Sequence, residues 1–290
     1  MSLEATRKVC LITGASAGIG AAVAREAARR HHDVMLTARR ADRLERLADA
    51  LRESHPGLRV AWHAADLDTP EAPDQLVQAT LDAMGRFDVL INNAGMGLPT
   101  LFADGVPADL RRQLSVNLVA PLMLTRAALP VLIERRGMVI NVGSAITSVP
   151  NPALGAYGAT KAGLAYWNDA LRRELRHTGV RVCLVEPGPV RTEFFDALVS
   201  LAPRPGGYHP MLDAPAPWMT ARVEEVARRI VRLIDHPRRR LSVMRRFVWP
   251  WRMAGMVFRL FPILGDVGVS SILRYHERKG PPRRSRADSR

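Results

Sequence analysis

Tyr157 and Lys161 stand four residues apart in "AYGATK", at the start of a run with helical periodicity. Residues four apart on a helix lie one turn from each other on the same face. The ordinary pKa of a phenol is near 10, and a neighbouring ammonium ion lowers it because the positive charge favours the phenolate. The spacing therefore predicts a general acid–base that exchanges a proton with a carbonyl or hydroxyl oxygen near neutral pH. Taken alone, Tyr157 also fits a boundary aromatic residue and Lys161 a solvated charge.

A glycine-rich turn, "TGASAGIG", spans residues 13–20 directly after an apolar, strand-like run. Gly14 permits a tight turn, and Gly18 and Gly20 let the backbone and the following helix approach a pyrophosphate. The N-terminus of that helix offers unpaired N–H groups and a positive dipole end to the phosphates. A strand, a glycine turn and a helix in this order predict a dinucleotide site, whereas a glycine turn without a ligand is the alternative.

Two arginines, Arg39 and Arg40, follow the second strand-like run, which ends "LTARR". A site that prefers NAD usually has an acidic residue here to bind the ribose hydroxyls. A guanidinium group suits a 2′-phosphate instead, because it forms paired hydrogen bonds with phosphate oxygens. The arginines therefore favour NADP(H), although both also fit solvated charges at the start of a helix.

These residues need a scaffold, and the rest of the chain has the pattern of one. Strand-like apolar runs alternate with helical periodicity, as in "KVCLITG" followed by "IGAAVAREAARR". Six to seven strands separated by helices predict right-handed crossovers and a parallel sheet covered on both faces. The predicted fold class is α/β, a single-domain Rossmann-type doubly wound parallel sheet. We assign residues 1–240 to this dinucleotide-binding catalytic domain, with a substrate lid at about 190–220, where Pro and Gly are frequent.

From about residue 7 to 237 the chain resembles a short-chain dehydrogenase/reductase. Six motifs follow the order and spacing of that family: "TGASAGIG", "NNAG" at 92–95, Asn117 in "SVNLVAP", Ser144 in "INVGS", "YGATK", and "PGPVRT" at 187–192. The resemblance implies a hydride transfer that interconverts a ketone and a secondary alcohol. It also implies a homodimer or a homotetramer.

The resemblance assigns a role to each of four catalytic residues. Tyr157 would be the acid–base, and Lys161 would lower its pKa while binding the nicotinamide ribose. Ser144 would hold the substrate oxygen, and Asn117 would anchor a water that links Lys161 to solvent. Each of the four has an ordinary structural explanation alone, but together behind a dinucleotide motif they indicate catalysis.

The resemblance also implies the contacts of an NADP(H) cofactor. Besides Tyr157, Lys161, Gly18, Arg39 and Arg40, the predicted cofactor-binding residues are Gly14, Ser16, Ile19, Gly20, Asp66, Asn93, Ala94, Gly95, Pro187, Gly188, Val190 and Thr192. Asp66 would bind the adenine, Asn93 to Gly95 its ribose, and Val190 and Thr192 the nicotinamide carboxamide. Ala17 stands where many NADP-preferring relatives carry a basic residue, which leaves the 2′-phosphate to Arg39 with Arg40 and Ser16 in support.

The net charge of +14 is concentrated at the C-terminal end. Residues 222–290 hold 18 of the 42 Arg and Lys but only 6 of the 28 Asp and Glu. Residues 241–275 mix arginine with Trp, Phe, Met and Leu, which fits an interfacial element on an anionic membrane surface. An apolar flap over the substrate site or over a partner subunit is the rival interpretation. We expect residues 276–290 to be a disordered basic tail.

Several other classes of site are not expected. Cys10 and Cys183 lie in apolar runs and are predicted to be buried free thiols, as in a reducing compartment. His31 and His32 have no Cys or carboxylate at metal-ligand spacing, so no metal site is predicted. No nucleic-acid-binding motif is present, and the N-terminus has no signal-peptide pattern. We therefore expect a cytoplasmic protein, with peripheral attachment to the inner face of the membrane as an alternative.

The substrate is predicted to be lipophilic, because the lid segment and the C-terminal extension are rich in apolar residues. Lipid-like ketones, steroids and 3-oxoacyl compounds all fit this description. A non-catalytic dinucleotide-binding sensor or scaffold is the alternative from another functional class. Since a sensor has no need of Asn117, Ser144, Tyr157 and Lys161 together, their joint presence favours an oxidoreductase.

Overall fold

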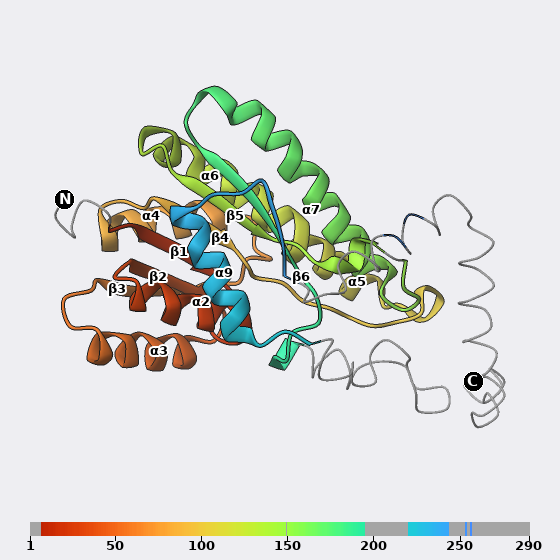
Figure 1. The fold of residues 1–290 in the computed structure, drawn as a ribbon. Helices are drawn as coiled ribbons and strands as arrows, with labels where there is room; N and C mark the ends of the chain where they lie inside the picture. The colour runs from red at the N-terminus through yellow and green to blue at the C-terminus, as the bar shows by residue number, and fades with distance from the viewer. Residues whose placement is uncertain (1–6, 149, 195–219, 244–252, 254–255, 257–290) are drawn as a thin grey trace.

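The computed structural model describes residues 7–148, 150–194, 220–243, 253 and 256. Its centre is a parallel sheet of seven strands in the order β3-β2-β1-β4-β5-β6-β7 (Figure 1). The strands are β1 (Val9–Thr13), β2 (Asp33–Ala38), β3 (Val60–Ala64), β4 (Val89–Asn92), β5 (Met138–Val142), β6 (Arg181–Pro187) and β7 (Arg240–Val243). This arrangement confirms the predicted fold class.

Helices cover both faces of the sheet (Figure 1). They are α2 (Gly18–Arg29), α3 (Ala41–Ser54), α4 (Ala72–Met84), α5 (Pro107–Leu114), α6 (Ala120–Glu134), α7 (Gly155–Glu174) and α9 (Val223–Asp235). A short π-helical turn, Ser115–Val119, joins α5 to α6. One core cluster packs α2, α3 and α9 on the sheet, and the other packs α4, α6 and α7.

The five inner strands are largely apolar because both of their faces are buried, whereas the outer strands β3 and β7 are partly exposed. In β1, Cys10 and Ile12 belong to the core cluster under α2, whereas Val9 and Leu11 belong to the cluster on the opposite face. This alternation follows from the period of two residues in a strand. Cys10 and Cys183 are free and buried, as predicted.

The strand order reverses direction between β1 and β4, so the chain continues from β1 to α2 on one face of the sheet and from β4 toward α6 on the other. In open α/β sheets such a switch point, at the carboxyl ends of the strands, is where ligands bind. The glycine turn leaves β1 at this edge, and residues 93–100 leave β4 beside it. The topology therefore brings the predicted cofactor and catalytic segments to one edge of the sheet.

The helical stretch Pro107–Glu134 is long and apolar enough to cross a membrane by length and composition. Its face toward the sheet carries Leu124, Ala128 and Leu132, each fully buried in the core. The stretch therefore has the packing of a core helix of this α/β fold.

The predicted C-terminal parts fall largely beyond what the structure describes. The seventh strand, β7, begins at Arg240, where the predicted catalytic domain ends, and it pairs with β6 through Val243. The lid from 195 to 219 and most of the basic extension lie outside the described residues, as does the whole basic tail. Their roles stay predictions.

Candidate functional site

Thr13 and Asn93 connect the glycine turn to the loop after β4 through hydrogen bonds. The Thr13 hydroxyl oxygen accepts hydrogen bonds from the backbone N–H groups of Asn93 and Ala94, both at 2.9 Å. The Asn93 side chain donates to the Thr13 carbonyl oxygen at 2.9 Å. The Asn93 side chain thus links the glycine turn to the loop after β4. Its contact with the adenine ribose, which the resemblance implies, stays a prediction.

Two of the predicted glycines are required by the shape of the turn. Gly14 has φ 66°, in the left-handed region that favours glycine. A Cβ atom on Gly20 would lie 2.2 Å from the Gly14 carbonyl oxygen and 2.7 Å from the Asn93 side-chain nitrogen. The first turn of α2 therefore packs directly on the loop, where only a glycine fits.

The N-terminus of α2 has the properties of a phosphate site. No side chain caps this helix, whose N-cap residue is Ala17. The first N–H groups of a helix have no partner within it, and they attract an anion. Since the turn is also narrow and free of side chains at Gly14 and Gly20, the residues present fit the pyrophosphate of a dinucleotide.

Three of the four predicted catalytic residues meet where β5 ends and α7 begins. The Ser144 side chain lies near enough to the Tyr157 phenol to act on its pKa, which it lowers. The Lys161 ammonium donates to the Val142 carbonyl oxygen at 2.9 Å and lies 5.9 Å from the centre of the Tyr157 ring. Tyr157 is 8% exposed and Lys161 4% exposed, so neither is a surface residue.

Burial shifts the pKa values of this pair toward their uncharged forms. It raises the pKa of Tyr157 to about 12, although the Ser144 side chain opposes the rise. It lowers the pKa of Lys161 to about 8. In the protein without a ligand, desolvation of the phenolate therefore dominates the pKa of Tyr157. The lowering by Lys161 in the cofactor-bound site stays a prediction.

Asn117 lies in the π-helical turn and is fully enclosed. Its side-chain oxygen accepts a hydrogen bond from the Met96 N–H at 2.8 Å, and its nitrogen donates to the Met96 carbonyl at 2.8 Å. The same nitrogen donates to the Thr160 hydroxyl at 3.2 Å, and that hydroxyl donates to the Tyr157 carbonyl at 2.7 Å. Asn117 thus couples the loop after β4 to the catalytic helix, and its predicted contact with a water stays a prediction.

Gly95 separates Asn117 from Lys161. A Cβ atom at Gly95 would lie 3.3 Å from the Asn117 side-chain oxygen and 3.6 Å from the Lys161 ammonium. The loop "NNAG" therefore reaches into the catalytic cluster itself, in addition to bordering the glycine turn.

At the end of β2, a cluster of charges surrounds Ser16. The Arg40 guanidinium donates to the Ser16 hydroxyl at 3.0 Å and to the Glu193 carboxylate at 3.1 Å. The Arg43 guanidinium contacts the same carboxylate at 2.7 Å. The two arginines hold the pKa of Glu193 below its usual range. Arg39 forms no hydrogen bond or ion pair with any residue that the structure describes.

Asp66, predicted to bind adenine, is already engaged in an ion pair. Its carboxylate accepts a hydrogen bond from Arg112 at 3.0 Å and another from the Asp68 N–H at 3.2 Å. Arg112 comes from α5 and also lies 3.5 Å from the Asp68 carboxylate. Asp66 follows β3, so this pair lies at the carboxyl ends of the strands, as the glycine turn does, but two strands away from β1.

The segment after β6 lies against the start of α2. Pro187 is the last residue of β6, Gly188 follows it, and Val190 forms a parallel bridge with Ala221. A Cβ atom at Gly18 would lie 3.3 Å from the Thr192 side chain. Ile19, which precedes Gly20, packs on the core under α2.

Sequence reasoning missed several residues of this edge: Thr13, Arg43, Arg112, Thr160 and Glu193. Arg43 had a local signal, since it lies three residues after Arg40 in the first turn of a predicted helix. The contacts of the others join segments far apart in the chain, so the sequence gives no direct signal for them. Among the described residues, no three His, Cys, Asp or Glu side chains are grouped as metal ligands.

Comparisons with known proteins agree on one family. The family model described as "short chain dehydrogenase" matches residues 8–200. A serine 3-dehydrogenase of Rhizobium radiobacter is 38% identical over 185 residues, which cover 63% of this chain and 72% of that protein. The uncharacterized oxidoreductase YxnA of Bacillus subtilis is 30% identical over 287 residues, which cover 97% and 77% of the two chains. A short-chain dehydrogenase from Sphingobium yanoikuyae, solved with NADPH, has a TM-score of 0.72 and 28% identity and covers 97% of this chain and 99% of its own.

Proposed function

The chain belongs to the short chain dehydrogenase family, and we propose that it is an NADP(H)-dependent oxidoreductase that interconverts a ketone and a secondary alcohol on a lipophilic substrate. The observation that carries this proposal is the meeting of Tyr157, Ser144 and Lys161 beside a glycine turn at the switch point. A sensor protein would need the turn but not the buried lysine, whose enclosure is costly.

The residues of the site divide the chemistry between them. When bound, the nicotinamide supplies or accepts the hydride. In reduction, Tyr157 donates its phenolic proton to the substrate oxygen, and Ser144 shares a hydrogen bond with the same group. Lys161 places a positive charge in an enclosed region, where it stabilises the negative charge that develops on oxygen. Asn117 keeps the loop after β4 and the catalytic helix in register.

The pKa of Tyr157 in the ligand-free protein favours the protonated phenol, which is the form that reduction uses. A pKa of about 12 also makes the phenol a weak acid, so efficient proton donation requires that bound ligands bring the pKa closer to neutral. Oxidation would need the phenolate, which burial disfavours.

NADP(H) is supported by the arginines after β2. Arg40 contacts Ser16, and Arg40 and Arg43 both pair with Glu193, so two guanidinium groups lie together where a 2′-phosphate would bind by displacing that carboxylate. The relative from Sphingobium yanoikuyae was solved with NADPH. Because Arg39 has no partner in the described part of the chain, it is free to join them.

A lipophilic substrate is supported by the surroundings of Tyr157. Its ring packs against Phe194 at 5.9 Å between centres, tilted by 45°. Leu154 and Ile146 complete this small apolar cluster. A substrate that brings its carbonyl to the Tyr157 hydroxyl would therefore lie against apolar side chains.

We also propose that the protein is a homo-oligomer. The helical segments Ser115–Val119, α6 and α7 expose Val119, Met123 and Tyr166, with Tyr166 82% exposed. Exposed apolar side chains gathered on neighbouring segments are typical of an interface. Contact with a second copy would bury them.

The test is a panel of ketones and alcohols assayed with both nicotinamides, using wild type, Tyr157→Phe and Tyr166→Phe. Tyr166 lies on the same helix outside the catalytic cluster, and Tyr166→Phe keeps the aromatic ring that the proposed interface would bury, so this variant is a matched control for the loss of a phenolic hydroxyl. We expect Tyr157→Phe to fold, to bind NADPH and to lose at least 99% of its turnover, about two orders of magnitude, as for loss of a general acid. Retention of more than half of the wild-type rate would refute the catalytic role.

A further inference from the structure

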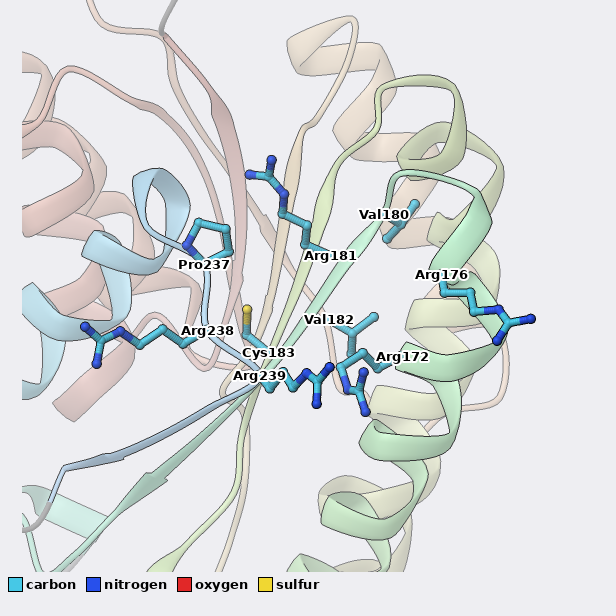
Figure 2. Close-up of a pocket in the computed structure, with 9 residues that line it drawn as sticks. All are labelled: Arg172, Arg176, Val180, Arg181, Val182, Cys183, Pro237, Arg238 and Arg239. Atoms are coloured by element: carbon cyan, nitrogen blue, oxygen red, sulfur yellow. The ribbon is translucent and has the colours of Figure 1, made fainter.

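The structure contains a basic cavity at the edge of the sheet opposite the catalytic residues. Its volume is about 290 Å³. The residues that line it are Arg172, Arg176, Val180, Arg181, Val182, Cys183, Pro237, Arg238 and Arg239 (Figure 2). Arg181 is the first residue of β6, whereas the predicted cofactor residue Pro187 is its last. Since a strand rises about 3.3 Å per residue, the two sites lie about 20 Å apart.

Five of the nine lining residues are arginines, and none is acidic. They come from three separate parts of the fold: the end of α7 and the turn after it, the start of β6, and the segment that leads into β7. Figure 2 shows Arg172 and Arg239 extending toward each other across the gap between α7 and that segment, while Arg181 and Arg238 extend outward. The cluster is therefore built by tertiary structure and is not a local run of charges.

The five arginines lack counter-charges in the described part of the chain. None of them forms an ion pair there, although the adjacent Arg240 contacts both Asp169 and Glu186, at 3.3 and 3.5 Å. The Nε atom of Arg172 is buried and has no hydrogen-bond partner among the residues that the structure describes. A buried N–H group without a partner is unfavourable, and an acceptor that enters the cavity would remove that cost.

The chemistry of the lining indicates what kind of acceptor fits. Guanidinium groups bind phosphate with paired, charge-assisted hydrogen bonds, and several of them together suit a group with more than one negative charge. The cavity is several times larger than the roughly 30 Å³ share of one water, so it has room for a phosphate and part of the organic group that bears it. Val182, Cys183 and Pro237 provide an apolar wall for that organic part.

We propose that this cavity is a second anion site, which binds the phosphate group of a phosphate ester. The ester is either a soluble metabolite or a lipid headgroup, because both present the same phosphate. The site is spatially separate from the proposed dinucleotide site. Its residues come from the end of α7 and the amino ends of β6 and β7, whereas the glycine turn lies at the carboxyl end of β1.

Inorganic pyrophosphate is the probe, titrated calorimetrically into the full-length protein saturated with NADP⁺ so that the glycine turn is not the binding site. The test variant is R172A/R239A, and the control is R25A/R228A, which removes two exposed arginines of α2 and α9 that form no ion pair with a described residue. We expect saturable binding to wild type and to the control. We expect at least tenfold weaker binding to R172A/R239A, and at least threefold weaker binding to R239A, which keeps the partly buried Arg172.

A second arm separates the two sources of phosphate. Wild type and R172A/R239A are sedimented with phosphatidylcholine vesicles that contain phosphatidic acid. A loss of vesicle binding in the variant assigns the site to a lipid headgroup, whereas equal vesicle binding with a loss of pyrophosphate binding assigns it to a soluble ester. Equal pyrophosphate binding to wild type, R172A/R239A and the control, or none to wild type, overturns the proposal. The result is the difference in pyrophosphate affinity between variants, so it does not depend on which nicotinamide the enzyme uses.

Discussion

Replacing Glu193 with Gln should tighten the binding of NADPH. The Glu193 carboxylate contacts Arg43 at 2.7 Å and Arg40 at 3.1 Å, so it occupies the guanidinium groups that we propose for the 2′-phosphate. The phosphate must displace these contacts and must also approach a like charge. The substitution Glu193→Gln removes the charge and keeps the size of the side chain.

The magnitude follows from the exposure of the pairs. The side chains of Arg40, Arg43 and Glu193 are 42%, 37% and 57% exposed, so solvent screens both interactions. Exposed ion pairs contribute about 0.2–1 kcal/mol each, and two in the lower half of that range give roughly 0.5–1 kcal/mol. Because about 1.4 kcal/mol changes a dissociation constant tenfold, NADPH should bind about two to five times more tightly. NADH, which carries a hydroxyl group in place of the phosphate, should bind with unchanged affinity.

The assay is a fluorescence titration of each reduced nicotinamide into wild type, E193Q and E53Q. Glu53 is exposed at the far end of α3 and has no ion pair with a described residue, so E53Q controls for the loss of one negative charge. An equal gain for NADH and NADPH would show that the arginines do not meet the 2′-phosphate. A loss of NADPH affinity would show that Glu193 holds Arg40 in its binding position and does not compete with the 2′-phosphate.

Three further outcomes follow from the same structure. In Gly20→Ala the new Cβ would lie 2.2 Å from the Gly14 carbonyl oxygen, so we expect about 1–3 kcal/mol of destabilisation and loss of NADPH binding. Gly158→Ala, which has open space around its Cβ, is the control and should show neither effect in thermal melts and NADPH titrations. Burial lowers the pKa of Lys161 from 10.5 to about 8, so the folded state holds fewer protons than the unfolded state in this window and wild-type stability rises with pH. Lys161→Met lacks this titration and should be more stable than wild type. The difference between their free energies of unfolding, measured by urea denaturation, should therefore shrink by up to about 1.4 kcal/mol per pH unit above pH 8, and a constant difference would contradict the shift. Met123→Glu should lower the sedimentation coefficient, because it places a charge on the exposed apolar face that we propose as the interface.

The order of the elements could be predicted from the sequence because each element carries its own period. The strands are buried on both faces and read as continuous apolar runs, and the helices between them read as amphipathic. The position of the glycine turn relative to the catalytic helix then follows from the crossover rule and the switch point. These are properties of short segments, which single-sequence reasoning handles well.

The contacts at the site could not be predicted to the same degree, because they join distant segments. Glu193 meets Arg43 across 150 positions of the chain. The spacing of Tyr157 and Lys161 fixes their common helix face but not whether solvent reaches it. Both are buried, and in the ligand-free protein the resulting desolvation raises the pKa of Tyr157, a contribution that the spacing alone does not reveal. The hydrogen bond from the Asn93 amide to the Thr13 carbonyl likewise joins distant segments and could not be predicted, whereas the contact of Asn93 with a ribose stays a prediction.

The opposite shifts of Tyr157 and Lys161 have one physical cause and one consequence for turnover. Enclosure disfavours the ammonium and the phenolate alike, so the ligand-free site keeps a neutral phenol beside a lysine that is charged at a cost. Transfer of the phenolic proton to a substrate oxygen creates a negative charge in this enclosed region, close to that ammonium. The attraction between the two charges is then stronger than it would be in water, and it exists only after the proton has moved. In the proposed mechanism, the energy that enclosure of Lys161 costs in the resting protein is therefore recovered as this charge develops, so that it raises the rate and does not merely tighten substrate binding.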